Sequence, residues 1–200
     1  RARAAHILGL CHVGAALPLL VQALDDPAPE VRVAATRALG RIGEPSASAA
    51  LLAAVGADRV VPAGPAADAL EGMGVGISGS LCDALSASSP TTRTVAAYLS
   101  GEGSFSRSLD GLRVALVGDD DATVREAAAV ALGRMGRADD VVVLLQQTSS
   151  GQPRALRRAC ASALGELGEP SAVDGLRELL GDPDPRLAET AATSLQLLAP

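Results

Sequence analysis

The stretch Val31–Gly43 reads VRVAATRALGRIG, and its apolar residues follow a helical pattern rather than the alternation of a strand. They fall at i, i+4, i+7, i+8 and i+11, which places all of them on one face of an α-helix: Val31, Ala35, Ala38, Leu39 and Ile42. Glycine is suited to end such a helix. The stretch therefore predicts an amphipathic helix that stops at Gly43.

The same stretch recurs with a period of about 31 residues. Residues 124–136 read VREAAAVALGRMG, and residues 156–168 read LRRACASALGELG. The first residues of the chain, RARAAHILGLCH, and the segment LAETAATSLQLL near its end fall in the same register. A repeat of this length is typical of stacked supersecondary units.

A second apolar helix precedes the Val31 helix. It covers Ala15–Leu24 (AALPLLVQAL) and is joined to the Val31 helix through DDPAP, in which aspartate caps a helix and proline suits its first turn. Each repeat is therefore one helical hairpin, and one hairpin cannot bury its own apolar stripe. We predict an all-α fold, an α-solenoid of about six helical hairpins preceded by one lone helix.

The composition agrees with closely packed helices and limits the function. Apolar residues make up 48% of the chain, but Tyr98 and Phe105 are its only aromatic residues. A net charge of −6 and so few aromatic side chains argue against a nucleic-acid partner. No apolar run is long enough to cross a membrane, so no membrane partner is expected.

The cysteines and the first residue bear on the origin of the chain. Three cysteines lie far apart in no paired motif, which indicates a reducing compartment. We therefore expect the protein to be located in the cytoplasm. The chain begins at Arg1 without Met, inside an expected helix, so we expect it to be a fragment of a longer protein.

The repeats DDPAPEVRVAATRALGRIG and DDDATVREAAAVALGRMG resemble HEAT repeats, most of all the short bacterial type first noted in phycobilin lyases. The match is regular over residues 1–55 and 118–200 and degenerate over residues 56–117, and we expect a single repeat domain. The resemblance implies a ladder in which an Asp of the hairpin turn and an early Arg of the second helix join neighbouring repeats. The residues at these positions are Asp25, Asp26, Arg32, Asp120, Arg125 and Arg157.

The resemblance also implies a non-catalytic scaffold of a bacterial cytoplasm that binds a protein or peptide on the concave face, which the second helices line. Helical spacing, together with the only aromatic residues, gives these candidate partner-binding residues: Arg37, Arg41, Tyr98, Phe105, Arg107, Glu126, Arg134, Arg158 and Glu166. Two alternatives stay open, a tetrapyrrole (bilin) lyase-like accessory protein and a HEAT-like DNA-binding protein.

The sequence predicts no catalytic residue, no cofactor and no metal site. Some HEAT-like proteins are hydroxylases that bind iron through His-Glu pairs, and the chain has no His-Glu dipeptide. Residues Gly74–Gly79 read GVGISG, a literal match to the dinucleotide-binding fingerprint, but that fingerprint follows a strand. An alanine-rich helix is expected just before it, so we interpret GVGISG as a loosened repeat boundary.

Register comparison gives two further expectations. The three cysteines align with positions of the apolar stripe and are expected to be buried: Cys11, Cys82 and Cys160. A glycine recurs in the middle of the second helices, where it is unfavourable unless backbones approach closely or the helix bends: Gly40, Gly133 and Gly165.

Overall fold

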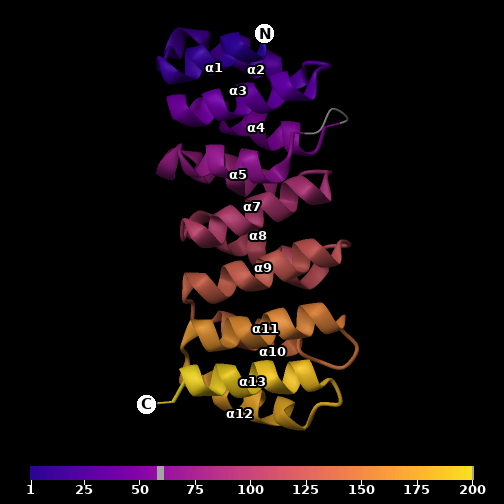
Figure 1. Ribbon diagram of the computed structural model, residues 1–200. Coiled ribbons are helices and arrows are strands. Elements are labelled where there is room, and N and C mark those ends of the chain that lie inside the picture. The colour runs from indigo at the N-terminus through magenta and orange to yellow at the C-terminus, as the bar shows by residue number, and fades with distance from the viewer. Residues whose placement is uncertain (58–60, 200) are drawn as a thin grey trace. The chain divides into compact units, whose positions relative to one another are not determined.

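The computed structural model describes residues 1–57 and 61–199, and within these ranges the regular elements are all helical (Figure 1). The α-helices are α1 (Ala2–Leu10), α2 (Leu17–Gln22), α3 (Pro29–Ile42), α4 (Ser48–Val55), α5 (Ala63–Glu71), α6 (Ser78–Ala84), α7 (Pro90–Glu102), α8 (Leu109–Gly118), α9 (Ala122–Met135), α10 (Asp140–Gln146), α11 (Arg154–Leu167), α12 (Val173–Glu178) and α13 (Pro185–Leu197).

Helix α1 is followed by six hairpins in the described ranges, which confirms the predicted α-solenoid. The hairpins are α2–α3, α4–α5, α6–α7, α8–α9, α10–α11 and α12–α13. Most first helices are short and begin or end in a 3₁₀ turn, such as η1 (Gly14–Ala16) before α2 and η2 (Ala23–Asp25) after it. The second helices are longer and carry the recurrent sequence pattern.

Glycines in the left-handed conformation end the second helices where the sequence predicts. Gly43, Gly136 and Gly168 have φ angles of 73°, 64° and 74°, and each directly follows the last residue of its helix. Only glycine adopts this conformation without strain, and it lets the chain reverse into the next first helix. A single glycine therefore ends each of these three second helices.

The chain forms two compact units, Arg1–Leu99 and Ser100–Pro200, and the division falls inside α7. In the first unit, α1 packs on α3 and α3 packs on α5 (Figure 1). In the second unit, α9 packs on α11 and α11 packs on α13. The single repeat domain expected from the sequence stays a prediction.

The core of each unit is built from leucine and alanine. In the Val31 helix, α3, four of the five predicted stripe residues are buried, and Ile42 at its end is half-buried. Apart from Ile77, the largest fully buried side chains are leucines in both units, for example Leu39, Leu51 and Leu132. Small alanines between them allow neighbouring helices to approach closely.

Glycines mark the points where consecutive second helices touch. A Cβ atom on Gly40 would lie 2.7 Å from the Cα of Ala69, and one on Gly133 would lie 2.7 Å from the Cα of Ala163. Gly165 meets Ser194 in the same way. Because real Cβ atoms do not come this close to a neighbouring backbone, the glycines are required by helix packing. Of the two explanations that the sequence left open, close backbone approach or a bend, the contacts support the close approach.

The GVGISG segment is an ordinary connection between two hairpins. Gly74 has a φ of 63° and opens a 3₁₀ turn, η4 (Gly74–Ile77), just as Gly43 is followed by η3 (Pro45–Ala47). The two turns pack on each other, and a side chain at Gly76 would collide with Pro45. The expected loosening is therefore wrong. The segment follows helix α5, as predicted, and not the strand that a dinucleotide fold requires.

One of the three cysteine predictions is wrong. Cys160 is buried and Cys82 is half-buried, but Cys11 is exposed. Helix α1 ends at Leu10, one residue before the position equivalent to the end of α3, and His12, which aligns with Gly43, takes a left-handed φ of 50°. Cys11 is therefore the residue that directly follows α1. None of the helices in the described ranges has the length and hydrophobicity needed to cross a lipid bilayer.

Candidate functional site

Arginine–aspartate ion pairs link successive hairpins. Arg1, at the start of α1, pairs with Asp26 in the turn of the next hairpin at 2.9 Å. Arg157, near the start of α11, pairs in the same way with Asp182 in the turn before α13. Arg157 also donates from Nε to the carbonyl of Thr148 at 2.7 Å and is almost fully buried.

The aspartates of these pairs also fix their own turns. Oδ1 of Asp26 accepts a hydrogen bond from the backbone N–H of Ala28, and Oδ1 of Asp182 accepts one from Asp184, both at 2.9 Å. The guanidinium of Arg157 and the N–H of Asp184 both favour the ionised form and hold the pKa of Asp182 below its ordinary value. Each aspartate therefore stabilises its own turn and also pairs with an arginine of the preceding second helix or, for Asp26, with Arg1 at the start of α1.

The predicted ladder has the right residue types but a different pairing. Nη1 of Arg32 donates to the carbonyls of Asp26 and Pro27, so it closes its own turn, whereas the carboxylate of Asp26 pairs with the preceding helix. Asp25 is exposed and belongs to η2. The acid therefore pairs with the arginine of the hairpin before it. The sequence GDPDP around Asp182, which resembles DDPAP, is the signal that sequence reasoning missed.

The turn before α9 also differs from the prediction. Asp120 is exposed, while Asp119 accepts from the N–H of Asp121 at 2.9 Å and Asp121 caps α9 by accepting from Thr123 at 2.8 Å. Arg125 donates to the amide oxygen of Gln152 at 3.3 Å. Gln152, which carries no charge, is thus the partner of Arg125, whereas the partner of Arg157 is the charged Asp182.

In the first unit, two predicted partner-binding arginines lie at the same hollow on the second helices. Arg37 and Arg41 of α3 line a cavity of ≈ 270 Å³ together with Asp68 of α5. Both arginines are exposed, and Nη1 of Arg41 also lies 3.2 Å from Nδ1 of His6 on α1. The floor is formed by Gly40 and Ala69, whose close contact keeps the two helices together.

The equivalent candidates of the second unit are engaged in ion pairs. Arg134 of α9 pairs with Glu102 at the end of α7, and Arg158 of α11 pairs with Asp184 at 3.3 Å. Glu166 is exposed at the end of α11, and Glu126 of α9 is half-buried. Of these four candidates, the two arginines thus stand in ion pairs, and Glu166 accepts a hydrogen bond from Ser162.

The three residues expected to form an aromatic partner surface lie on both sides of the unit division. Tyr98 belongs to the first unit, where its side chain is exposed on α7. Phe105 belongs to the second unit and is half-buried against Gly103, while Arg107 is exposed in η5 (Ser106–Ser108). Each is accessible within its own unit, and their joint role stays a prediction.

A buried ion pair in the second unit escaped the sequence reasoning. Nε of Arg113 on α8 donates to Oδ1 of the fully buried Asp140 on α10 at 2.6 Å. Asp140 raises the pKa of Arg113, chiefly through this hydrogen bond. The pair joins two first helices, and it has no counterpart in the second-helix pattern from which the candidates were chosen.

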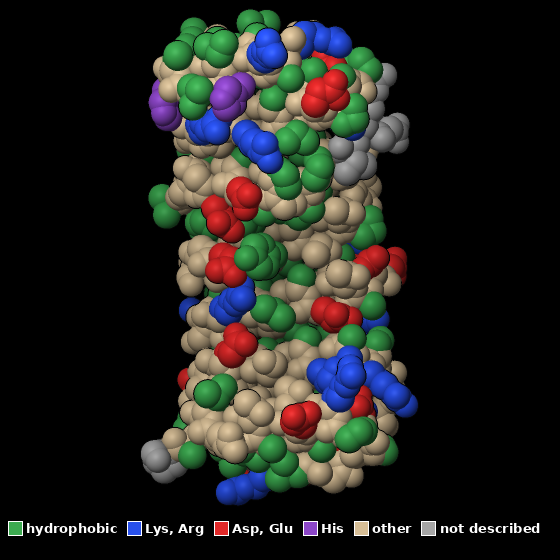
Figure 2. Space-filling view, viewed as in Figure 1, with side chains coloured by type: hydrophobic (Ala, Val, Ile, Leu, Met, Phe, Trp, Pro, Cys, Tyr) green, Lys and Arg blue, Asp and Glu red, His purple; other side chains and the backbone are tan. Residues whose placement is uncertain are grey.

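The face that carries the second helices is chemically mixed in both units. Figure 2 views this face and shows basic, acidic and apolar side chains interspersed among neutral surface, with no continuous basic stripe. In the described residues, no three His, Cys, Asp or Glu side chains lie close enough together to hold a metal ion. Among the candidate residues, Arg37 and Arg41 line a cavity that an acidic residue, Asp68, also lines.

Stacked hairpins with capping glycines and interhairpin ion pairs define an α-solenoid of short repeats. A family model described as HEAT repeats matches residues 1–71, 79–151 and 141–199, and the chain belongs to this family. The matched ranges include most of the stretch that the sequence marks as degenerate. No curated protein is significantly similar to the chain.

Solved structures with a similar fold come from several kinds of protein. Human deoxyhypusine hydroxylase in complex with glycerol has a TM-score of 0.54 and 22% identity, over 98% of this chain and 78% of the enzyme. Kap121p has a TM-score of 0.68 and 12% identity, over 92% of this chain and 25% of Kap121p, so the chain spans about a quarter of that protein. A designed armadillo repeat protein has a TM-score of 0.52 and 16% identity, over 99% and 93% of the two chains. At these identities the likeness concerns the fold alone.

Proposed function

We propose that the chain is a non-catalytic scaffold that binds a protein or peptide on the face formed by its second helices. The observation that carries this proposal is the hollow in which Arg37 and Arg41 stand opposite Asp68. Arginine is suited to such a role because its planar guanidinium binds carboxylates in a fixed geometry. The expected ligand is a segment of a partner protein that presents an acidic side chain to the two arginines and a basic or amide group to Asp68.

The similar folds support this proposal without establishing it. A structure of Kap121p bound to Nup53p has a TM-score of 0.68 at 14% identity, so a solenoid of this type serves there to bind another protein. The three cysteines lie far apart in the sequence and form no C-x-x-C motif, which supports a reducing compartment such as the cytoplasm for the interaction.

The proposal is tested by reversing the charge of the two arginines. The double variant Arg37→Glu and Arg41→Glu should lose the proteins that the wild-type chain retains after crosslinking in an extract of its source cells. Arg137→Glu with Arg177→Glu is a matched control, since both residues are exposed, the charge change is equal and Arg177 lies on the first helix α12. Equal capture by all three proteins would refute the proposed face.

Two direct titrations check the alternatives. A bilin added to the protein should leave its absorption spectrum unchanged, and a fluorescent DNA duplex should show no increase in anisotropy at low salt. A saturable spectral shift would support the lyase-like alternative, and retention of DNA would support the nucleic-acid alternative.

A further inference from the structure

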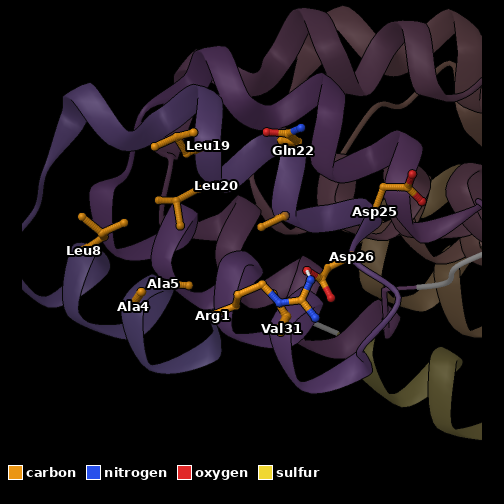
Figure 3. A pocket seen from close by; sticks show the side chains of 11 residues that line it. Arg1, Ala4, Ala5, Leu8, Leu19, Leu20, Gln22, Asp25, Asp26 and Val31 are labelled. Atoms are coloured by element: carbon orange, nitrogen blue, oxygen red, sulfur yellow. Dashed lines mark ion pairs between the residues drawn. The ribbon is translucent and has the colours of Figure 1, made fainter.

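The arginine–aspartate pairs between hairpins share one position in the turn. Asp26 and Asp182 each lie two residues before the N-cap residue of a second helix, α3 and α13 respectively. Each carboxylate pairs with an arginine near the start of the helix that packs on this second helix, and Figure 3 shows the guanidinium of Arg1 directed at the carboxylate of Asp26. In both pairs, the group that meets the guanidinium is therefore an oxyanion at the same place in the turn.

At the junction of α9 and α11, a glycine takes this position. Gly151 lies two residues before Pro153, the N-cap residue of α11. Arg125 is the fourth residue of α9, as Arg157 is the fourth residue of α11, and α9 packs on α11 as α11 packs on α13. Arg125 is thus the arginine that corresponds to Arg157, and position 151 corresponds to its acidic partner.

Arg125 has fewer partners than Arg157. The guanidinium of Arg157 donates to the carbonyl of Thr148 and to both carboxylate oxygens of Asp182. Within the described residues, Arg125 makes one hydrogen bond, at 3.3 Å to the amide oxygen of Gln152, and no ion pair. Its Nε is buried and has no hydrogen-bond partner among these residues. Because a buried donor of a charged group is costly without a partner, this guanidinium favours the binding of an anion.

The turn beside Arg125 has room for such an anion and faces solvent. Ser149, Ser150 and Gly151 are exposed. A Cβ atom on Gly151 would have none of the described atoms of its surroundings within 4 Å. The N-cap residue Pro153 forms no side-chain cap, and the free N–H groups of a first helical turn favour negative charge. An oxyanion from outside the repeat pattern can therefore reach this position.

We propose that Arg125 and the turn of residues 149–152 bind a phosphate group at the position that an aspartate carboxylate holds beside Arg1 and Arg157. The planar guanidinium matches phosphate oxygens as well as it matches carboxylates, and a phosphate offers further oxygens to the N–H groups of α11. Two sources share this chemistry, inorganic phosphate and a phosphoryl group attached to Ser150, the residue next to position 151. The site lies in the second unit and does not depend on the function proposed for the hollow beside Arg37 and Arg41.

The attached source requires phosphoryl transfer from a nucleoside triphosphate by a protein kinase. The hydroxyl oxygen of Ser150 forms the new bond to the terminal phosphorus, and the bond between this phosphorus and the bridging oxygen breaks. The nucleoside diphosphate leaves, and the hydroxyl proton passes to a base of the kinase. The product carries three phosphoryl oxygens and a charge near −2 one residue from position 151.

NMR titration of the isotope-labelled protein tests the free source. At constant ionic strength, the Nε–H resonance of Arg125 should shift saturably with inorganic phosphate, and chloride should not reproduce the shift. Gly151→Asp supplies a carboxylate from the chain itself and should abolish the saturable shift. Gly14→Asp is the matched control, because it adds the same charge at another exposed glycine with open space around it, and it should leave the phosphate affinity unchanged. Circular dichroism checks that both variants are folded.

Protein phosphorylated at Ser150 by genetic encoding of phosphoserine tests the attached source. The Nε–H resonance of Arg125 should be shifted without added phosphate and should no longer respond to it. The urea midpoint should exceed that of the unmodified protein, because the phosphoryl group gives the guanidinium a charged partner. Phosphorylation at Ser46, an exposed residue of η3 in the first unit, is the control and should leave this resonance unchanged.

The outcomes separate the two sources and leave the proposal open to refutation. A saturable response of the wild type identifies the free source, and a shifted resonance in the Ser150-phosphorylated protein alone identifies the attached one. The proposal is overturned if neither protein shows a shift at Arg125, or if Gly151→Asp binds phosphate as tightly as the wild type. An equal shift with chloride would also overturn it, since that shift would report screening alone. The Arg37→Glu and Arg41→Glu double variant should bind phosphate as the wild type does, which separates this site from the proposed face.

Discussion

Arg157 and Asp182 show how one residue pair stabilises two levels of the structure. The guanidinium joins α11 to the next turn through Asp182 and holds the preceding turn through the carbonyl of Thr148. Because the arginine is almost fully buried, its charge needs a partner, and the carboxylate meets that need while it fixes its own turn. The interhairpin pair is therefore more than a surface contact.

This pair makes the second unit sensitive to acid. The pKa of Asp182 in the folded protein lies below its value in the unfolded chain, which is about 3.9. The stabilisation is therefore complete above about pH 4 and is lost as the pH falls through the lower, folded-state pKa. We expect Asp182→Asn to lower the urea midpoint at pH 7, and we expect the difference from wild type to shrink steadily towards pH 2. A constant difference across this range would contradict the role of the charge.

The cysteines give a second prediction at this scale. Burial raises the pKa of Cys160 to about 12, so its thiol is both shielded and unionised in the folded protein, whereas Cys11 is exposed. At pH 8, iodoacetamide should modify Cys11 rapidly and Cys160 only after unfolding in urea. Mass spectrometry of tryptic peptides measures both rates. Equal modification of the two thiols in the native protein would show that α11 is not packed as described.

The crossing of two second helices depends on a glycine at the contact. Gly40→Ala should destabilise the protein by about 1–3 kcal/mol, the usual cost of forcing extra atoms into a packed contact, since the new Cβ would meet the backbone of Ala69. Gly64→Ala is the control, because Gly64 lies in α5 with open space around it. That change should be neutral or stabilising by up to about 1 kcal/mol. Urea unfolding measures both, and equal effects would contradict the packing argument.

The hairpins could be read from the sequence because local signals agree with one another. The apolar stripe of α3, the proline in its first turn and the left-handed Gly43 all act within a few residues, so a single sequence contains them. The pairing of Asp26 was missed because its partner, Arg1, lies at the start of α1, the helix before the α2–α3 hairpin, and the pairing depends on how the two stack. Cys11 was misplaced although the register holds, since α1 ends one residue before it.

The candidate site could be predicted only in part. Helical angles correctly picked exposed arginines on α3, but they gave no indication that Asp68 of α5 stands at the same hollow. That juxtaposition depends on how closely α3 and α5 approach at Gly40 and Ala69.

At the scale of the whole molecule, packing and charge are distributed along a repeating chain. Each hairpin packs mainly on its neighbours, so each of the two compact units holds its own core of leucine and alanine. Charge is distributed in the same way, as ion pairs between successive hairpins and as mixed side chains on the second-helix face (Figure 2).

Site-specific photocrosslinking tests the proposed binding face most directly. A benzophenone side chain placed at Asp68, in the hollow, should give covalent adducts with a partner protein when the chain is irradiated in its source cells. The same group at Ala49, an exposed position on the first helix α4 of the same hairpin, should give none. The adducts from position 68 should disappear when Arg37 and Arg41 are changed to Glu. Adducts from position 49 alone, or adducts from position 68 that survive the charge reversal, would contradict binding on the second-helix face.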